Sequence, residues 1–282
     1  MEMLSINDKG FPHSLRKISP KVNRLFYKGK YDKKLFDKSI AVVGSRKMTQ
    51  YGQRIIQSIL PQLIEAGATI ISGFMYGVDQ EAHEITLENN GNTVAVLGWG
   101  IDWKVTPADK KLYSEIENKG LILSEYPKST SPQLWMFPRR NRIMAALAQA
   151  VLVIEAAPNS GSLITASFAK KYKKQLFAIP GPATSVVSQG TNNLIKNREA
   201  ILVTSAEDLL KEMKWSVNLI REKPDSNNRD LLLQLLSSES LTIDEIALSL
   251  NQPIEKVSVK LSILQLKGQI EEKEGKYYAS TS

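Results

Sequence analysis

Three segments of this chain combine glycine, hydroxyl and arginine residues in a way that suits phosphate binding. Gly44-Ser45-Arg46 follows a short apolar run, Ser72-Gly73 opens a loop that ends near Asp79, and Ser160-Gly161 precedes Thr165. Glycine lets backbone amides approach an anion, serine donates a hydroxyl, and arginine binds phosphate through two parallel hydrogen bonds. An ordinary tight turn would also account for Gly44-Ser45-Arg46 taken alone. Asp79 is interpreted as a helix cap or loop brace.

A cluster of basic residues lies in the middle of the chain, within the run Phe137-Pro138-Arg139-Arg140-Asn141-Arg142. Arginine contacts phosphates and stacks on bases, and phenylalanine offers a flat face to a base. The alternative is a solvated basic surface with Phe137 anchored in the core. We favour a binding role for the arginine cluster, whereas Phe137 taken alone suits either position.

The residues that usually perform catalysis are scarce. The chain has no cysteine and only two histidines, His13 in an N-terminal extension and His83 on a predicted helix among polar residues. We interpret His83 as a surface or capping group. No Walker loop, dinucleotide fingerprint or zinc-protease motif is present. We therefore expect no catalytic residue, cofactor or metal, and we interpret Glu125 and Glu155 as acceptors that orient arginines.

Short apolar runs alternate with segments of helical spacing, which predicts a parallel sheet covered on both faces. A helix over 49–66, closed by Gly67, and a second over 80–89 separate the first strands. In such a sheet the ligand binds at the carboxyl ends of the strands, where the phosphate-binding segments fall. The sequence thus predicts a Rossmann-like, doubly wound, mostly parallel α/β domain with strands at 39–43, 69–71, 93–97, 121–124, 150–155 and 175–179.

The alternation ends near Trp215. Three helical stretches follow, at 229–236, 243–250 and 254–266, and then a pair of strands on either side of Gly275. Thr242 and Glu245 have the spacing of a capping box. This order predicts a small winged-helix domain. The expected organisation is an N-terminal extension packed on the core (1–38), the Rossmann-like domain (39–215), a linker (216–228) and the winged helix (229–282).

Charge is unevenly distributed over the 282 residues, whose formal net charge is +8. Residues 228–282 hold six Lys or Arg and eight Asp or Glu, a net −2, which leaves +10 for the rest of the chain. A polyanion should therefore meet the large domain first. We find no apolar run long enough for a membrane span and no secretory signal, so we expect no membrane contact and a cytoplasmic location.

Taken together and in order, these segments resemble the DNA-processing protein A family, also called Smf. The resemblance runs from about residue 11 to residue 200 and extends to the C-terminal winged helix. It rests on Phe11-Pro12, Gly44-Ser45-Arg46, Ser72-Gly73, Gly77-Val78-Asp79, Gly98-Trp99-Gly100-Ile101-Asp102, Ser124-Glu125, Phe137-Pro138-Arg139-Arg140-Asn141-Arg142-Ile143, Ser160-Gly161-Ser162-Leu163-Ile164-Thr165-Ala166, Pro180-Gly181 and Asn193-Leu194-Ile195.

The resemblance implies a non-enzymatic recombination mediator. Such a protein binds incoming single-stranded DNA during natural transformation, protects it, loads the RecA recombinase onto it and forms a homodimer. By motif position, Arg46 contacts phosphate, and Arg140, Asn141 and Arg142 line the strand-binding pocket. Its floor is then built by Ser72, Gly73, Ser160, Gly161 and Thr165.

The chain departs from the family pattern at Phe74 and Met75, which replace two small residues. These side chains could narrow the pocket or offer a new stacking surface. The alternative function is a nucleotide-binding or nucleoside-phosphate-hydrolysing Rossmann-like enzyme, although the Pro-Gly-Gly-x-Gly-Thr loop of such hydrolases is missing. A duplex-binding regulator led by the winged helix is a third possibility, and the negative charge of that module argues against it.

Overall fold

The computed structural model describes residues 2–215, 231–250, 252–266, 268–273 and 275–279. The chain divides into two compact units, residues 1–218 and 219–282, and each is considered by itself. The predicted linker, 216–228, lies outside the described residues, as do the first two residues of the first predicted winged-helix helix.

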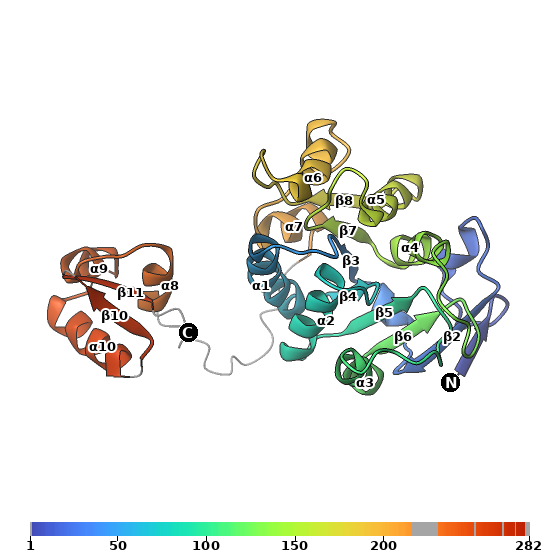
Figure 1. Cartoon of the computed structure of the whole chain (residues 1–282), viewed down its shortest axis with the longest axis horizontal. Helices are drawn as coiled ribbons and strands as arrows, with labels where there is room; N and C mark the ends of the chain where they lie inside the picture. The colour runs from blue at the N-terminus through green and yellow to red at the C-terminus, as the bar shows by residue number, and fades with distance from the viewer. Residues whose placement is uncertain (1, 216–230, 251, 267, 274, 280–282) are drawn as a thin grey trace. The chain divides into compact units, whose positions relative to one another are not determined.

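The first unit is built on a nine-stranded sheet (Figure 1). Seven strands, β3 to β9, run parallel, while β1 and β2 are antiparallel additions beside β6. The predicted mostly parallel α/β fold is confirmed. The strand order is β1 (Glu2–Ser5), β2 (Arg24–Gly29), β6 (Leu121–Ser124), β5 (Thr93–Leu97), β4 (Thr69–Ser72), β3 (Ser39–Val43), β7 (Ala150–Val153), β8 (Gln175–Ala178) and β9 (Ile201–Leu202).

The chain reverses direction across the sheet at β3. After β3 it adds β4, β5 and β6 on one side, and it then crosses to the other side to add β7, β8 and β9. Residues on β3 are buried on both faces, which explains its uninterrupted apolar sequence. The gap between the ends of β3 and β7 is the topological switch point, where ligands bind in folds of this type.

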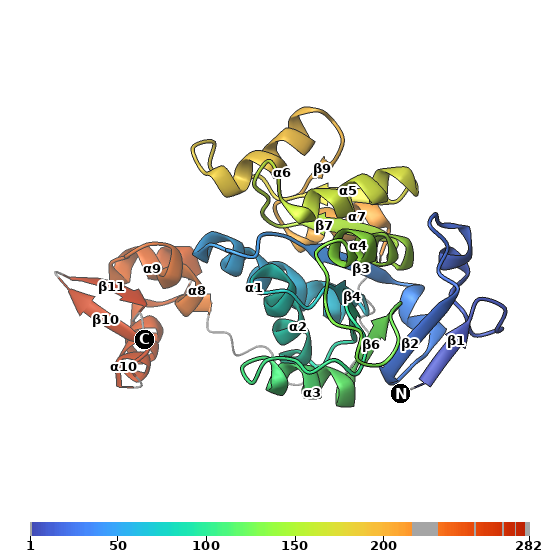
Figure 2. The same ribbon diagram turned by 45° about the vertical axis from the view of Figure 1, so that its right-hand side comes forward.

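Helices cover both faces of the sheet (Figure 2). Ala41 and Val43 pack with α4 and α5, whereas Ile40 and Val42 pack with α1, α2 and α7, because successive strand residues point to opposite faces. The helices are η1 (His13–Lys17), η2 (Lys33–Phe36), α1 (Gln50–Glu65), α2 (Val78–Glu88), α3 (Lys110–Lys119), α4 (Met136–Leu147), α5 (Gly161–Lys171), α6 (Val186–Lys196) and α7 (Ala206–Met213).

The strands β1 and β2 were not predicted from the sequence. Tyr27 of β2 pairs with Leu123 of β6, and Leu4 of β1 pairs with Leu25. Leu25 and Phe26 are buried side by side while the rest of the segment is partly exposed. A buried run of two residues is too short to indicate a fully buried strand, and it lacks the alternation of a half-exposed strand. Pairing with β6 therefore determines that this segment is a strand.

The second unit has the predicted winged-helix order of three helices and a two-stranded sheet. Its own core includes Leu232, Ile246, Val257 and Leu261. The Thr242 hydroxyl accepts from the Glu245 amide at 3.3 Å, and the Glu245 carboxylate accepts from the Thr242 amide at 2.8 Å, which is the predicted capping box. The elements are α8 (Leu231–Ser238), α9 (Ile243–Leu250), α10 (Ile254–Leu266), β10 (Ile270–Lys273) and β11 (Lys276–Ala279). Among the described residues, no helix has the length and apolarity to cross a membrane.

Candidate nucleic-acid interface

A pocket with a volume of about 590 Å³ opens at the switch point of the sheet. Its walls are the loop after β3, the loop before α2, the pocket-facing side of α4 and the beginning of α5. Nine of the thirteen predicted binding residues line it, although they come from three separate segments of the chain. They are Gly44, Ser45, Arg46, Phe137, Arg140, Asn141, Ser160, Gly161 and Thr165.

Arg46 and Phe137 form an exposed face of this pocket. Arg46 is exposed, and its guanidinium carbon lies 5.5 Å from the centre of the Phe137 ring. Phe137 also meets Trp99 edge-on, with 6.1 Å between ring centres. A cation and a flat ring therefore lie together at the surface, held in place by a buried aromatic neighbour.

Arg140 is buried behind this face. Its Nη1 donates to the carbonyl oxygens of Gly73 and Val96, and its Nε donates to Asn141 Oδ1 at 3.2 Å. Burial lowers the pKa of Arg140 to about 10, so the guanidinium remains charged at neutral pH. Burial raises the pKa of the nearby Asp79, and the Arg140 charge opposes that shift. Arg140 thus joins α4 to the ends of β4 and β5 while its charge faces the pocket.

Ser72 and Gly73 lie beneath the pocket and do not line it. The Ser72 hydroxyl donates to the Val42 carbonyl at 2.7 Å, which ties β4 to β3. A Cβ atom at position 73 would overlap the Arg140 guanidinium and the Asp79 carboxylate. The structure therefore gives Gly73 a packing role, in which the missing side chain leaves room for Arg140.

The beginning of α5 supplies an anion-binding helix end. Ser160 is the N-cap residue, and its hydroxyl accepts from the Ser162 amide at 3.3 Å. At Gly161 a Cβ atom would have no neighbour within 4 Å, so this helix end is open to a ligand. The Thr165 hydroxyl has no hydrogen-bond partner within the described part of the chain. Free amides and the helix dipole favour a negatively charged ligand here.

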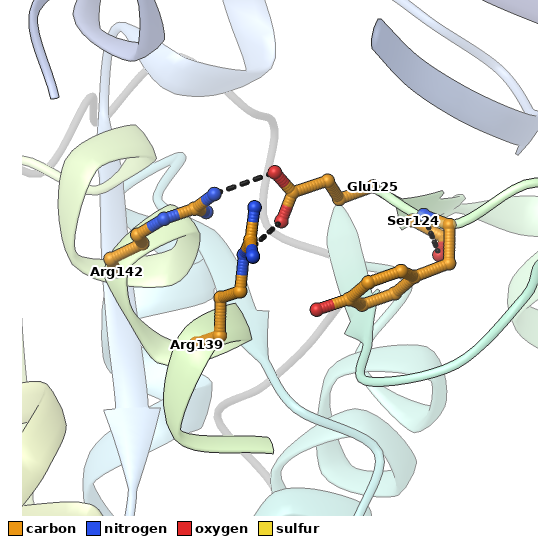
Figure 3. Close-up of polar contacts among 5 residues, drawn as sticks. Ser124, Glu125, Arg139 and Arg142 are labelled. Carbon is orange, nitrogen blue, oxygen red and sulfur yellow. Dashed lines mark hydrogen bonds and ion pairs between the residues drawn. The ribbon is translucent and has the colours of Figure 1, made fainter. Parts of the chain in front are cut away.

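Arg139 and Arg142 do not line the pocket. Both side chains point from α4 to Glu125 (Figure 3). Arg142 is fully buried and its Nη2 lies 2.6 Å from Glu125 Oε1. Arg139 is half-exposed, and its Nε lies 3.5 Å from Glu125 Oε2. The two arginines are three residues apart and so share a helix face that excludes Arg140 and Asn141. Glu125 orients arginines as predicted.

Glu155, in contrast, forms no ion pair with an arginine in the part of the chain that the structure describes. It accepts a hydrogen bond from the Thr49 backbone amide at 3.0 Å and from the Thr49 hydroxyl, at the start of α1. The prediction for this residue is therefore wrong. The carboxylate instead fixes the helix that follows the Gly44-Ser45-Arg46 segment.

The prediction for His83 is also wrong, because this side chain is completely buried. Its Nδ1 lies 2.6 Å from the Thr93 hydroxyl, and burial lowers its pKa to about 3. Asp79, His83 and Thr86 recur at helical spacing on the buried face of α2. Polar residues at this spacing usually mark the exposed face of a helix, so the sequence pattern was misleading. The neighbouring Phe74 is buried in contact with His83, Trp99 and Tyr113, and only Met75 of the two unusual loop residues reaches the pocket.

Sequence reasoning missed the apolar part of the pocket lining, which includes Tyr76, Leu134, Met144, Ile164 and Val187. Leu134 and Tyr76 are strongly exposed for residues of their type. Tyr76 and Leu134 lie in loops and Met144, Ile164 and Val187 lie in three different helices, so only the fold reveals that they converge on one site.

Two family models match this chain. The model for DNA recombination-mediator protein A matches residues 2–214, and that for the DprA winged helix domain matches residues 221–276. The chain belongs to the DNA recombination-mediator protein A family. Both parts of the chain are thus accounted for by models from one family.

Similar proteins occur in several bacteria. The DNA processing protein DprA of Streptococcus pneumoniae is 41% identical over 75% of this chain and 74% of its own length. Protein Smf of Escherichia coli is 33% identical over 98% of this chain and 76% of its own length. Protein Smf of Synechocystis is 38% identical over 72% of this chain, but the match spans only 52% of that longer relative.

Two solved structures have the same fold. DNA processing protein A from Streptococcus pneumoniae superposes with a TM-score of 0.71 at 40% identity, covering 75% of this chain and 74% of the other. DNA processing protein A from Helicobacter pylori gives a TM-score of 0.67 at 29% identity, covering 76% of this chain and 96% of the other. The latter structure is described as revealing a single-stranded DNA binding mode.

Proposed function

We propose that this chain binds single-stranded DNA in the pocket at the switch point and acts as a recombination mediator without catalysing a reaction. The observation that carries the proposal is the pairing of Arg46 with Phe137 beside the open end of α5. One nucleotide needs a cation or amide group for its phosphate and a flat surface for its base. All of these line the same pocket.

This arrangement suits DNA of any sequence. Arg46 and the α5 amides are donors to phosphate oxygens, which are the same in every nucleotide. Stacking on Phe137 uses the face of a base, which all four bases have. The single strand is favoured over duplex because its bases are unstacked and accessible to the ring.

The cellular role that we propose follows the family. The protein protects incoming single-stranded DNA during natural transformation and loads the RecA recombinase onto it, acting as a homodimer in the cytoplasm. The single-stranded DNA binding mode described for the Helicobacter pylori protein supports the DNA-binding part of this proposal. The excess of positive charge in residues 1–227 supports it as well.

Fluorescence anisotropy with a labelled 20-nucleotide single strand and the matching duplex, over a salt series, tests the proposal. We expect preference for the single strand and a loss of affinity as salt increases. Arg46→Ala should weaken binding at least about tenfold, since a charge-assisted contact contributes roughly 1.5–3 kcal/mol. Arg54→Ala is the matched control, because Arg54 is exposed on α1 and does not line the pocket.

Preference for duplex, or equal effects of Arg46→Ala and Arg54→Ala, would contradict the proposed site. A protein that binds no single strand but releases free base from nucleoside monophosphates would instead be a Rossmann-like hydrolase. The pocket volume of about 590 Å³ is large enough for a nucleotide, so the base-release assay belongs in the same experiment.

A further inference from the structure

Four lysines converge on a second hollow, at the far end of α5 from the candidate interface. This hollow has a volume of about 430 Å³ and is lined by residues from η1, from the end of α4 and from the segment that closes α5. We call it the lysine pocket. Its basic residues are His13, Lys17, Lys171, Lys173 and Lys174.

The positive charge of the lysine pocket is not neutralised locally. Among the described residues that line it, none is an Asp or a Glu. Lys174 is partly buried, donates to the Ala148 carbonyl at 2.6 Å and therefore supports the fold. Lys17, Lys171 and Lys173 are exposed and form no ion pair within the described part of the chain. Like charges held together repel one another, and an anion bound between them relieves that repulsion.

The helix dipole alone does not explain this cluster. Lysines near the end of a helix complement its negative terminus, which accounts for Lys171 and Lys173. Lys17 comes from η1, a different element far away in sequence, and it lines the same hollow. Convergence from two elements is typical of a surface that binds an anionic partner.

Helices α4 and α5 connect the two pockets, and they lie side by side in both views (Figures 1 and 2). Phe137 at the start of α4 lines the candidate interface, and Ala146 near its end lines the lysine pocket. On α5 the corresponding residues are Gly161 and Lys171. At about 1.5 Å per residue, the 11 residues of α5 separate the pockets by roughly 16 Å.

The two helices between the pockets carry no acidic residue of their own, although Glu199 pairs with Lys170 of α5 and Glu125 pairs with Arg139 and Arg142 of α4. Neither α4 nor α5 contains an Asp or a Glu. On α5 the exposed residues Gly161, Ile164, Ser167 and Lys171 recur every three or four positions, so they form one stripe that runs from the first pocket to the second. A polyanion lying along this stripe meets no carboxylate of either helix.

We propose that the lysine pocket binds the sugar-phosphate backbone of the single strand that occupies the candidate interface. The inference rests on the proposed function and adds a second contact further along the same strand. A stacked strand, which is the most compact form, advances roughly 3.4 Å per nucleotide, so about five nucleotides are enough to bridge 16 Å. Lysine ammonium groups on flexible stems suit such contacts, because they bind phosphate without reading sequence.

Binding of oligothymidylates of 2 and 20 nucleotides to the double variant Lys171→Gln/Lys173→Gln tests this inference. The shorter strand fills the candidate interface alone, and its affinity is measured by competition. The matched control is Lys211→Gln/Lys214→Gln. Lys211 lies in the last turn of α7, and the φ of 53° at Lys214 matches the 56° at Lys173. Both control lysines are exposed, and neither lines the candidate interface or the lysine pocket.

The lysine-pocket variant should bind the 20-mer about tenfold more weakly at 0.1 M salt. The slope of log affinity against log salt concentration should be smaller in magnitude by roughly 0.7 for each phosphate that the variant no longer binds. Affinity for the 2-mer should change by less than about twofold, because two nucleotides, stacked or unstacked, cannot reach the second pocket. The control variant should match the wild type for both strands, and the unfolding temperatures of all three proteins should agree.

Two results would overturn the second contact: an effect on the 20-mer no larger than that of the control, or an equal loss for both strand lengths. Failure of the proposed function gives a different result, since the wild type would then bind neither strand. If Arg46→Ala weakens both strands while the lysine-pocket variant resembles the control, the candidate interface stands and the lysine pocket is not part of it.

Discussion

The side-chain amide of Asn141 donates to the backbone carbonyl of Gly161 at 3.0 Å. This bond ties the middle of α4 to the first residue of α5 and fixes the anion-binding end of one helix against the basic helix beside it. Because Asn141 adjoins Arg140, the same turn of α4 holds both a charged wall of the pocket and the helix end that faces it. This contact therefore fixes two of the pocket walls, α4 and the beginning of α5, relative to each other.

Gly161→Asp should affect folding and binding in opposite directions. A carboxylate in the first turn of a helix stabilises it by about 0.3–1 kcal/mol, and the open space at Gly161 accommodates the side chain. The same carboxylate repels a DNA phosphate. We expect an unchanged or slightly higher unfolding temperature together with single-strand affinity at least about tenfold lower. Gly161→Asn is the neutral control, and equal affinities of the two variants would argue against a phosphate at this helix end.

Phe137→Leu should weaken binding of single-stranded DNA at least about fivefold, because stacking of a base on an aromatic ring contributes roughly 1–3 kcal/mol. Leucine keeps an apolar contact with Trp99, so the fold should be preserved. Phe137→Tyr retains the ring and should bind nearly as well as the wild type. Anisotropy measures the affinity of each variant for single-stranded DNA. If Phe137→Tyr bound DNA as weakly as Phe137→Leu, base stacking would not be the reason for the loss of affinity.

Arg142→Ala should destabilise the protein without acting directly on DNA. Removing one partner of a buried ion pair costs about 3–5 kcal/mol, which lowers the unfolding temperature by roughly 6–20 °C in a domain of this size. Arg139→Ala removes a half-exposed partner of the same carboxylate and should cost less than about 1 kcal/mol. Thermal unfolding followed by circular dichroism measures both, and similar midpoints for the two variants would contradict the burial of Arg142.

His83 should make the protein less stable in mild acid. Its pKa is about 3 in the folded state, below the value of about 6.5 in an unfolded chain, so protons bind the unfolded state first. The contribution of neutral His83 to the free energy of unfolding is fully present above pH 6.5 and is lost as the pH falls towards 3. At pH 5 the loss amounts to about 2 kcal/mol relative to a non-titrating side chain.

Denaturant unfolding at pH 7 and pH 5 measures this effect. His83→Gln should show a smaller loss of stability between the two pH values than the wild type, whatever its stability at pH 7. His13→Gln is the matched control, because His13 is exposed. An identical pH dependence in wild type and His83→Gln would rule out His83 as its source.

The sequence predicted the central strands well, because a parallel strand covered on both faces must be apolar throughout. Val42 and Val43 of β3 and Ile70 and Ile71 of β4 are buried without exception. The phosphate-binding segments could be assigned to one edge of the sheet for the same reason, since parallel strands place their carboxyl ends together. Nine predicted binding residues consequently line one pocket.

The sequence could not show which face of a helix each side chain occupies. Arg140 and Arg142 have the same chemistry and lie two residues apart, yet the helix turns them to opposite sides, one to the pocket and the other to Glu125. His83 was misplaced because polar residues line the buried face of α2. These side chains are buried through partners distant in sequence, such as Thr93 and Glu125, which no local pattern reveals.

The two outer strands of the sheet constrain how copies of this chain can associate. β1 has four residues and β9 has two, so each edge exposes very few unpaired backbone groups. Such short edges offer a poor template for adding a strand from another molecule, and natural proteins use them to prevent sheets from joining. A dimer formed by continuing the sheet from one copy into the next is therefore disfavoured. We expect the contact between copies to be made by side chains on the helical faces, where substitutions can weaken it without disturbing the sheet.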